Sequence, residues 1–373
     1  LSAAETMDIL RSRYGRVVEV ALDPEYTDPT TPPDQLPSNL RGPAVNQPDG
    51  SWLQYSNMVG INVRTVGSFW NIIKYVLTLP SAQDSVHILP IWEAGVAGSM
   101  YGISSWYLNP EFFSTELAET ISSLDTIDQQ LRAVVNLLHL MGRSVGMDVI
   151  PHTDRFSQVA LAFPEYFEWL QRQDTAIIDH RADLHLDVQQ AIRRFLGRHG
   201  SAVDEAIPAD LFDVSVDEER RMRLLFGIPA DADGRETRRN LLIQHLYRYG
   251  YEPVPGTMAP PFRGLEVDTR PEAKTVDANG MVWRDFKITK PEPMSRVFGP
   301  LARYKLYERL ADNAEWQVDF SRPRRMVWDY VCQKYFQIQQ RYAFDFMRGD
   351  MSHVQMRPHG VPEKVDRYYD ILG

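Results

Sequence analysis

The chain of 373 residues has little cysteine, no long apolar run and no excess of basic residues. Its single cysteine, Cys332, excludes an intrachain disulfide and a metal site built from cysteines. The apolar segment 72–79 is far shorter than the roughly 20 residues that a membrane-spanning helix needs. The net charge of -10 argues against nucleic acid as a partner, because phosphate binding requires a basic surface. Because no basic-then-apolar leader follows Leu1, we expect a cytoplasmic location and no membrane partner.

The composition is that of a globular protein, with 43% hydrophobic and 24% charged residues. This is ample apolar material for a core, and the length predicts one large domain with an insertion, or two domains. The oligomeric state is left open by the sequence.

Between residues 58 and 152, short apolar segments alternate with helical patterns. Residues 58–66, 86–92 and 144–152 are β-branched or continuously apolar, as buried strands are. A helix is predicted over residues 69–79. A second helix begins after Thr126, where Gln129 completes a capping box, and ends at Gly142. Continuous apolar strands separated by helices predict a parallel sheet that is covered on both faces.

The remaining segments follow other patterns. A helix is predicted over residues 3–14, whereas the Pro- and Asp-rich residues 23–50 predict an extended, loop-like arm, and residues 93–125 a long loop. Residues 155–325 are interpreted as a large insertion with helices over 164–171, 186–196 and 298–310, and with a hairpin that turns at Asn279-Gly280. A helix over 326–340 leads into a fourth strand, in which Tyr342, Phe344 and Phe346 alternate, and residues 366–372 predict the start of another helix.

The fourth strand ends in Arg348-Gly349-Asp350, and His353 follows closely. Side chains two residues apart in a strand point to the same face, so the guanidinium of Arg348 can keep Asp350 ionised at neutral pH. A carboxylate that stays anionic is what a nucleophile in covalent catalysis requires. An ordinary structural ion pair at a strand end would give the same pattern, because such pairs also shift pKa values.

Asp148 and His152 stand at the end of the third predicted strand, as Arg348, Asp350 and His353 do at the end of the fourth. Polar residues gathered at the C-terminal ends of successive parallel strands are typical of the catalytic face of a barrel. The same carboxylate-plus-His chemistry on two neighbouring strands favours a functional site over a structural ion pair.

Three motifs resemble those of glycoside hydrolase family 13, the α-amylase superfamily, in their order and spacing. They are Met100-Tyr101-Gly102-Ile103 with the following Asn109-Pro110-Glu111-Phe112, Gly146-Met147-Asp148-Val149-Ile150-Pro151-His152-Thr153, and Phe346-Met347-Arg348-Gly349-Asp350-Met351-Ser352-His353. The resemblance covers about residues 58–157 and 326–355. It implies an α/β fold, a partial TIM (β/α)8 barrel with the first four strands. After an N-terminal arm over residues 1–50, residues 51–154 would form the first part of the barrel, 155–325 a domain inserted after the third strand, and 326–373 the fourth strand and the start of the next helix.

The resemblance also implies roles for individual residues. Asp350 would be the nucleophile, and Arg348 would orient it. The side chains that would bind the sugar are Tyr101, which stacks on the ring, Asp148, His152 and His353.

The sequence departs from the family at Pro151, where the family usually has Asn, often a calcium ligand. The resemblance therefore implies no cofactor and no metal, and argues against calcium. The family's general acid, a Glu, and its last His-Asp pair lie on later strands. We therefore expect a fragment that is truncated at both ends, with its acid beyond Gly373, or a barrel that a second chain completes. By itself the chain is expected to bind glucan weakly and to turn over slowly or not at all.

The function implied is a retaining glycoside hydrolase or transglycosylase that acts on α-1,4-linked glucose polymers, with an α-glucan or malto-oligosaccharide as its partner. The long arm and the large insertion favour a glucanotransferase or maltosyltransferase over a hydrolase. The alternative is a non-catalytic carbohydrate-binding or scaffold protein with a degenerate barrel.

Three other features give weaker indications of function. The His- and Asp-rich residues 180–187 predict a solvated face rather than a metal site. The aromatic residues 163–169 predict core rather than a sugar platform. Glu93 ends the second predicted strand within reach of the cleft, but it lies too early in the family's pattern to serve as the general acid.

Overall fold

The computed structural model describes residues 1–47, 49–95, 98–150, 152–173, 176–254, 265–276, 282–284, 286–288, 301–309 and 318–350. The chain divides into two compact units. The first unit consists of Leu1–Ile91, Leu108–Val149 and Tyr330–Asp350, and the second contains Trp92–Tyr107 and Ile150–Asp329. Within the described ranges, every helix is too short or too polar to cross a lipid bilayer.

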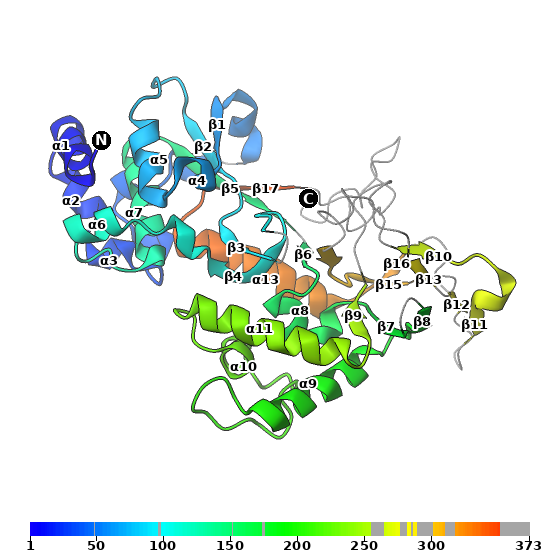
Figure 1. The fold of residues 1–373 in the computed structure, drawn as a ribbon. Helices are drawn as coiled ribbons and strands as arrows, with labels where there is room; N and C mark the ends of the chain where they lie inside the picture. The colour runs from blue at the N-terminus through cyan, green and yellow to red at the C-terminus, as the bar shows by residue number, and fades with distance from the viewer. Residues whose placement is uncertain are drawn as a thin grey trace. The chain divides into compact units, whose positions relative to one another are not determined.

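A parallel four-stranded sheet forms the centre of the first unit (Figure 1). Its strands lie side by side in chain order: β1 (Met58–Ile61), β2 (Ser85–Ile88), β5 (Ser144–Val149) and β17 (Phe346–Gly349). All three neighbouring pairs are parallel. The chain is thus a mixed α/β protein, and the parallel sheet predicted from the sequence is confirmed. Its closure into a barrel stays a prediction.

The helices of the first unit connect and flank these strands. They are α1 (Ala3–Tyr14), α2 (Val17–Ala21), α3 (Pro24–Thr27), η1 (Pro33–Gln35), η2 (Ser38–Leu40), η3 (Pro43–Asn46), η4 (Gly50–Tyr55), α4 (Val63–Val66), α5 (Phe69–Val76), η5 (Pro110–Phe112), α6 (Thr115–Thr120) and α7 (Ile127–Leu140). The predicted capping box at Thr126 and Gln129 begins α7, and the fully buried Leu131, Val134 and Val135 form its apolar stripe. Helix α7 packs against β5 and α5, so it covers the sheet at its middle.

The N-terminal segment is more regular than predicted. The helix predicted over residues 3–14 is present as α1. Residues 23–50 were predicted as an extended arm, but they form α3 and a series of 3-10 turns, and Leu36 and Leu40 are buried. Helices α2, α3 and η2 contact α7. The prediction was wrong because the prolines begin single helical turns, in which their fixed φ fits, rather than preventing them.

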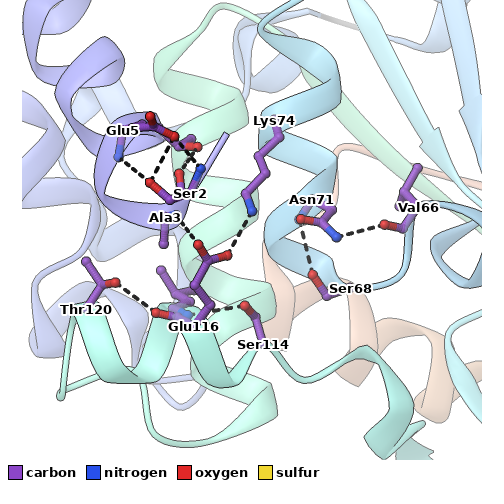
Figure 2. Close-up of polar contacts among 12 residues, drawn as sticks. Ser2, Ala3, Glu5, Val66, Ser68, Asn71, Lys74, Ser114, Glu116 and Thr120 are labelled. Atoms are coloured by element: carbon purple, nitrogen blue, oxygen red, sulfur yellow. Dashed lines mark hydrogen bonds and ion pairs between the residues drawn. The ribbon is translucent and has the colours of Figure 1, made fainter.

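One carboxylate links three helices at the start of the chain (Figure 2). The side chains of Ser2 and Glu5 form a capping box at the N-terminus of α1. The Ala3 N–H donates to Oε1 of Glu116 at 2.6 Å, and Lys74 Nζ lies 2.9 Å from Oε2 of the same residue. Glu116 on α6 therefore connects α1 to α5.

The second unit has the following elements. They are β3 (Trp92–Ala94), β4 (Ile103–Leu108), β6 (His152–Asp154), α8 (Gln158–Ala162), η6 (Pro164–Tyr166), β7 (Trp169–Gln173), β8 (Ala176–Asp179), α9 (His185–His199), α10 (Glu218–Phe226), α11 (Ala232–Tyr247), β9 (Tyr251–Pro253), β10 (Leu265–Val267), η7 (Pro271–Ala273), β11 (Lys274–Val276), β12 (Val282–Arg284), β13 (Phe286–Ile288), β14 (Leu301–Arg303), β15 (Tyr307–Arg309) and β16 (Val318–Pro323). A five-stranded sheet has the order β10-β13-β8-β7-β9, and α11 packs against α9 and α10.

Several sequence predictions fail in the second unit. Residues 164–171 were predicted as a helix, but they form η6 and the start of β7. Residues 298–310 were predicted as a helix, but the described part forms β14 and β15. The predicted loop 93–125 contains β3, β4 and α6. Strand pairing outweighs the local pattern at β7, which pairs with β9, and at β14, which pairs with β6, whereas β3 and β4 pair with each other inside the predicted loop.

Other predictions hold. Helix α9 matches the helix predicted over residues 186–196, and β11 pairs antiparallel with β12 as the hairpin predicts. The turn Asn279-Gly280 and residues 366–372 lie outside the described residues. The aromatic residues 163–169 are core, because Phe163, Tyr166, Phe167 and Trp169 are all buried.

Helix α13 (Arg325–Tyr342) precedes β17 and matches the helix predicted over residues 326–340. The alternation from Tyr342 to Phe346 predicted a strand, but Tyr342 ends the helix and Ala343 turns the chain with a left-handed φ of 57°. The buried Arg132 on α7 caps this helix, donating to the carbonyls of Gln340 and Arg341 at 3.3 and 2.7 Å. Its burial lowers the pKa of Arg132 to about 10.

Candidate active site

Four polar side chains come together on neighbouring strands of the parallel sheet in the first unit. Asp148 lies near the end of β5, and Arg348 lies directly opposite it on β17. Asp350 follows the last residue of β17, and its N–H donates to the carbonyl of Val149 at 2.9 Å. His87 belongs to β2, on the other side of β5. The group therefore lies across β2, β5 and β17, toward the C-terminal ends of β5 and β17.

One guanidinium holds two carboxylates in this group. Nη1 of Arg348 donates to Oδ1 of Asp148 at 2.8 Å, and its Nη2 lies 3.0 Å from Oδ1 of Asp350. The ion pair that the Arg-x-Asp spacing predicts is therefore present. Its roles in binding and catalysis stay predictions.

His87 makes the second contact with Asp148. Its Nε2 lies 2.8 Å from Oδ1 of Asp148, the same oxygen that Arg348 contacts. Only 1% of the Asp148 side chain is exposed, against 54% of the Arg348 side chain. The sequence motifs did not single out His87. A signal was available, because a polar residue between Val86 and Ile88 in a buried strand needs a polar partner.

The surroundings of Asp148 keep its carboxyl group ionised. Burial raises the pKa of the carboxyl, but the hydrogen bonds from His87 and Arg348 outweigh this effect, and the net pKa falls below the ordinary value of 3.8. The hydrogen bond to Asp148 is also the largest cause that raises the pKa of Arg348. At neutral pH the group thus contains a buried anion next to a permanent cation.

Two further predicted residues, Tyr101 and His152, contact each other in the second unit. Nε2 of His152 donates to the backbone carbonyl of Tyr101 at 3.2 Å. His152 begins β6, which pairs with β14. Burial lowers the pKa of His152 to about 4, so its imidazole is neutral at pH 7. A neutral imidazole has one donor and one acceptor nitrogen, which is the combination that a hydroxyl group also offers.

The remaining sequence candidates have other environments or lie outside the described residues. His353 and Pro151 lie outside them. Glu93 forms a two-pronged ion pair with Arg235, at 2.6 and 2.7 Å, and so is a structural carboxylate of the second unit. Among the residues that the structure describes, which include 180–187, no three His, Cys, Asp or Glu side chains gather as a metal ion would require.

Comparison with known proteins gives likeness to solved structures only. No family model matches the chain, and no curated protein matches it. A trehalose-6-phosphate hydrolase from Bacillus licheniformis is 17% identical over 33% of this chain and 23% of its own, with a TM-score of 0.25. An alpha-amylase from Lactobacillus plantarum is 22% identical over 39% and 36%, with a TM-score of 0.26. The isomaltulose synthase from Protaminobacter rubrum is 15% identical over 34% and 24%, with a TM-score of 0.27.

These matches span 23% to 36% of the length of those solved structures. The enzymes are of the kind that the sequence motifs resemble, but TM-scores of 0.25 to 0.27 carry no argument about this chain. A function for the chain has to be inferred from the residues of the first unit and from the motifs.

Proposed function

We propose that the chain is an α-glucan-active retaining glycoside hydrolase or transglycosylase, with Asp350 as its nucleophile. One observation carries this assignment: the guanidinium of Arg348 contacts the carboxylates of both Asp148 and Asp350. Two carboxylates and one arginine at the ends of adjacent parallel strands supply an oriented nucleophile and a second anion beside it. The resemblance to glycoside hydrolase family 13 assigns these same three residues.

The chemistry depends on the positions of the oxygens. Arg348 contacts Oδ1 of Asp350 and thereby orients the carboxylate. The other oxygen, Oδ2, then attacks the anomeric carbon of a glucose unit. A bond forms between Oδ2 and that carbon while the bond to the leaving-group oxygen breaks, and a general acid, which in the family is a Glu on a later strand, gives that oxygen a proton. Attack by water on the glycosyl-enzyme then gives hydrolysis, and attack by a sugar hydroxyl gives transfer. Both outcomes return Asp350 to its free carboxylate.

Asp148 supports this step electrostatically. A retaining glycosidase passes through a transition state with positive charge on the sugar ring, which an adjacent ionised carboxylate stabilises. The net lowering of the pKa of Asp148 keeps that carboxylate ionised at working pH. Its oxygens also accept hydrogen bonds from sugar hydroxyls, and by the resemblance Tyr101, His152 and His353 add further sugar contacts.

The finer assignment concerns the fold and the acceptor. We assign the four parallel strands to the first half of a TIM barrel, with the segment after β5 as the inserted domain. The substrate is an α-1,4-linked glucose polymer. The long N-terminal segment and the large insertion favour transfer to a sugar, as in a glucanotransferase or maltosyltransferase, over hydrolysis.

An activated donor tests the nucleophile without requiring a general acid. In α-maltosyl fluoride the leaving group departs as fluoride ion and needs no proton, so attack by Asp350 is sufficient to release it. The expected result is fluoride release by the 373-residue chain that falls by roughly 10³-fold or more in Asp350→Asn. The matched control is Asp8→Asn, in which the replaced side chain is 80% exposed, and it should release fluoride at the wild-type rate.

Two outcomes would contradict the assignment. Release that persists unchanged in Asp350→Asn would exclude Asp350 as the nucleophile. Binding of maltotriose without any fluoride release would instead favour the alternative function, a carbohydrate-binding protein with a degenerate barrel.

A further inference from the structure

Three residues are in register with one another on the neighbouring strands that carry the candidate active site. His87 on β2 is paired with Gly146 on β5, and Gly146 is paired with Phe346 on β17. Aligned residues of a parallel sheet point to the same face, and so do residues two further along each strand. The row that contains Asp148 and Arg348 therefore lies on this face, one step closer to the C-terminal ends of the strands.

Gly146 makes room for the ring of Phe346. A Cβ atom at position 146 would overlap three carbons of that ring, so a residue with a side chain would displace it. The ring centroid lies 6.2 Å from that of the His87 imidazole and 5.8 Å from that of Trp52, which meets it edge-on. The imidazole of His87 is thereby packed on one side by a ring that is itself held in place.

The hydrogen bond from His87 converges with that from Arg348. The two donors come from β2 and β17, on opposite sides of β5, and both contact Oδ1 of Asp148 at 2.8 Å. Two donors that meet at one oxygen from different directions fix the rotation of a carboxylate, which one donor alone would not. Arg348 is half exposed and also holds Asp350, whereas 11% of the His87 side chain is exposed.

We propose that His87 is a positioning residue for Asp148. Its Nε2–H, held in place by Phe346 above Gly146, fixes the Asp148 carboxylate in the orientation that presents it to a sugar hydroxyl. The sugar in this statement rests on the proposed function, whereas the hydrogen bond to Asp148 does not. The experiment therefore needs one readout with sugar and one without.

Two amide substitutions at position 87 test the hydrogen-bond donor separately from the packing of the imidazole ring against Phe346. The amide nitrogen of Gln reaches close to the place of Nε2, whereas that of Asn is one methylene short. His87→Gln therefore keeps the donor near Asp148, and His87→Asn withdraws it, while both remain polar and neutral. A third variant, Phe346→Leu, leaves both hydrogen-bonding partners and removes the ring that packs the imidazole.

The readout without sugar is the titration of the Asp148 carboxyl carbon by NMR. Its pKa is lowered partly by His87, so His87→Asn should move the midpoint to higher pH, and His87→Gln should leave it near the wild-type position. The imidazole nitrogen spectrum of the wild type should show a proton on Nε2 of His87. An Nε2 of His87 without a proton, or a titration midpoint of Asp148 that is unchanged in His87→Asn, would overturn the proposal.

The readout with sugar is the affinity for maltotriose by calorimetry. Loss of one hydrogen bond to a charged group predicts about tenfold weaker binding in His87→Asn, recovery in His87→Gln, and an intermediate loss in Phe346→Leu. An affinity equal to that of the wild type in all three variants would contradict a positioning role. If His87→Asn does not fold, Phe346→Leu must show the weaker binding and the raised Asp148 midpoint, or the proposal fails.

The two readouts also distinguish the failure of this inference from that of the proposed function. Wild-type chain that does not bind maltotriose contradicts the proposed function, and the Asp148 titration then decides the role of His87 by itself.

Discussion

Replacing Arg348 by Met removes the guanidinium and keeps an unbranched side chain along the same path. Asp148 would remain buried, with 1% of its side chain exposed, and would keep its contact with His87. A hydrogen bond to a charged group contributes about 1.5–3 kcal/mol, and removing one partner of a fully buried pair costs more. Because Arg348 is 54% exposed and water can replace it in part, we expect a loss near the low end, about 2 kcal/mol.

The loss should depend on pH in a defined direction. The pKa of Asp148 is lowered in the folded protein, so its interactions stabilise the fold above the ordinary value of 3.8 and are lost as the pH falls through the folded value. The difference between wild type and Arg348→Met should therefore be largest near pH 7 and should shrink below about pH 4.

The assay is amide hydrogen exchange of the peptides that contain β5 and β17, because it reports the first unit separately from the second. A double-mutant cycle with Asp148→Asn isolates the interaction. In the Asp148→Asn background, Arg348→Met should cost less than about 1 kcal/mol, since the fully buried anion is gone and only Asp350, with 19% of its side chain exposed, loses its partner. Equal costs in the two backgrounds, or a cost that grows as the pH is lowered, would refute the electrostatic account.

Three further changes have defined outcomes. Gly146→Ala should destabilise the fold by about 1–3 kcal/mol in urea unfolding, because its methyl group overlaps Phe346, whereas Gly197→Ala, with nothing within 4 Å, should not destabilise. Arg132→Met leaves the last carbonyls of α13 without their buried donor, so exchange of the amides at that end should accelerate at least tenfold. Burial lowers the pKa of His152 from 6.5 to about 4, so between these values the unfolded chain binds a proton that the folded chain does not. The free energy of unfolding should therefore decrease by about 3 kcal/mol as the pH falls from 6.5 to 4, and His152→Gln should remove this decrease.

The parallel sheet could be predicted because its strands carry a strong local signal. Residues 145–149 lack polar side chains except at Asp148, and the capping box at Thr126 fixes the start of the preceding helix. Continuous apolar strands separated by helices have few other arrangements. The long helices α7, α9 and α13 were found for the same reason, since their periodicity extends over several turns.

Short segments could not be predicted in the same way. Trp169–Gln173 has aromatic and polar residues at spacings that fit a helix or a strand, and pairing with β8 and β9 decides for the strand. Residues 342–346 alternate like a strand, yet the helix continues to Tyr342 and a left-handed Ala343 comes after it. Contacts from distant parts of the chain determine these segments, and a local window does not contain them.

The candidate site likewise has a part that local sequence predicts and a part that depends on distant contacts. The pairing of Arg348 with Asp350 arises from a spacing of two residues, so the sequence predicts it. The contacts of Arg348 and His87 with Asp148 depend on the register of three strands, which places residues 61 and 200 positions apart at 2.8 Å. A polar residue in the middle of a buried strand is the signal that points to such a partner, and His87 carries it.

The central claim, that Asp350 attacks the sugar, is tested most directly by trapping the covalent intermediate. A maltosyl fluoride with a second fluorine at C5 forms the glycosyl-enzyme and slows its breakdown, because the electronegative substituent destabilises the positive charge in both steps. Peptide mapping by mass spectrometry should find one 5-fluoromaltosyl group, attached to Asp350. A maltosyl group on Asp148 or another residue, or fluoride release without any adduct on the peptide that contains Asp350, would contradict the claim.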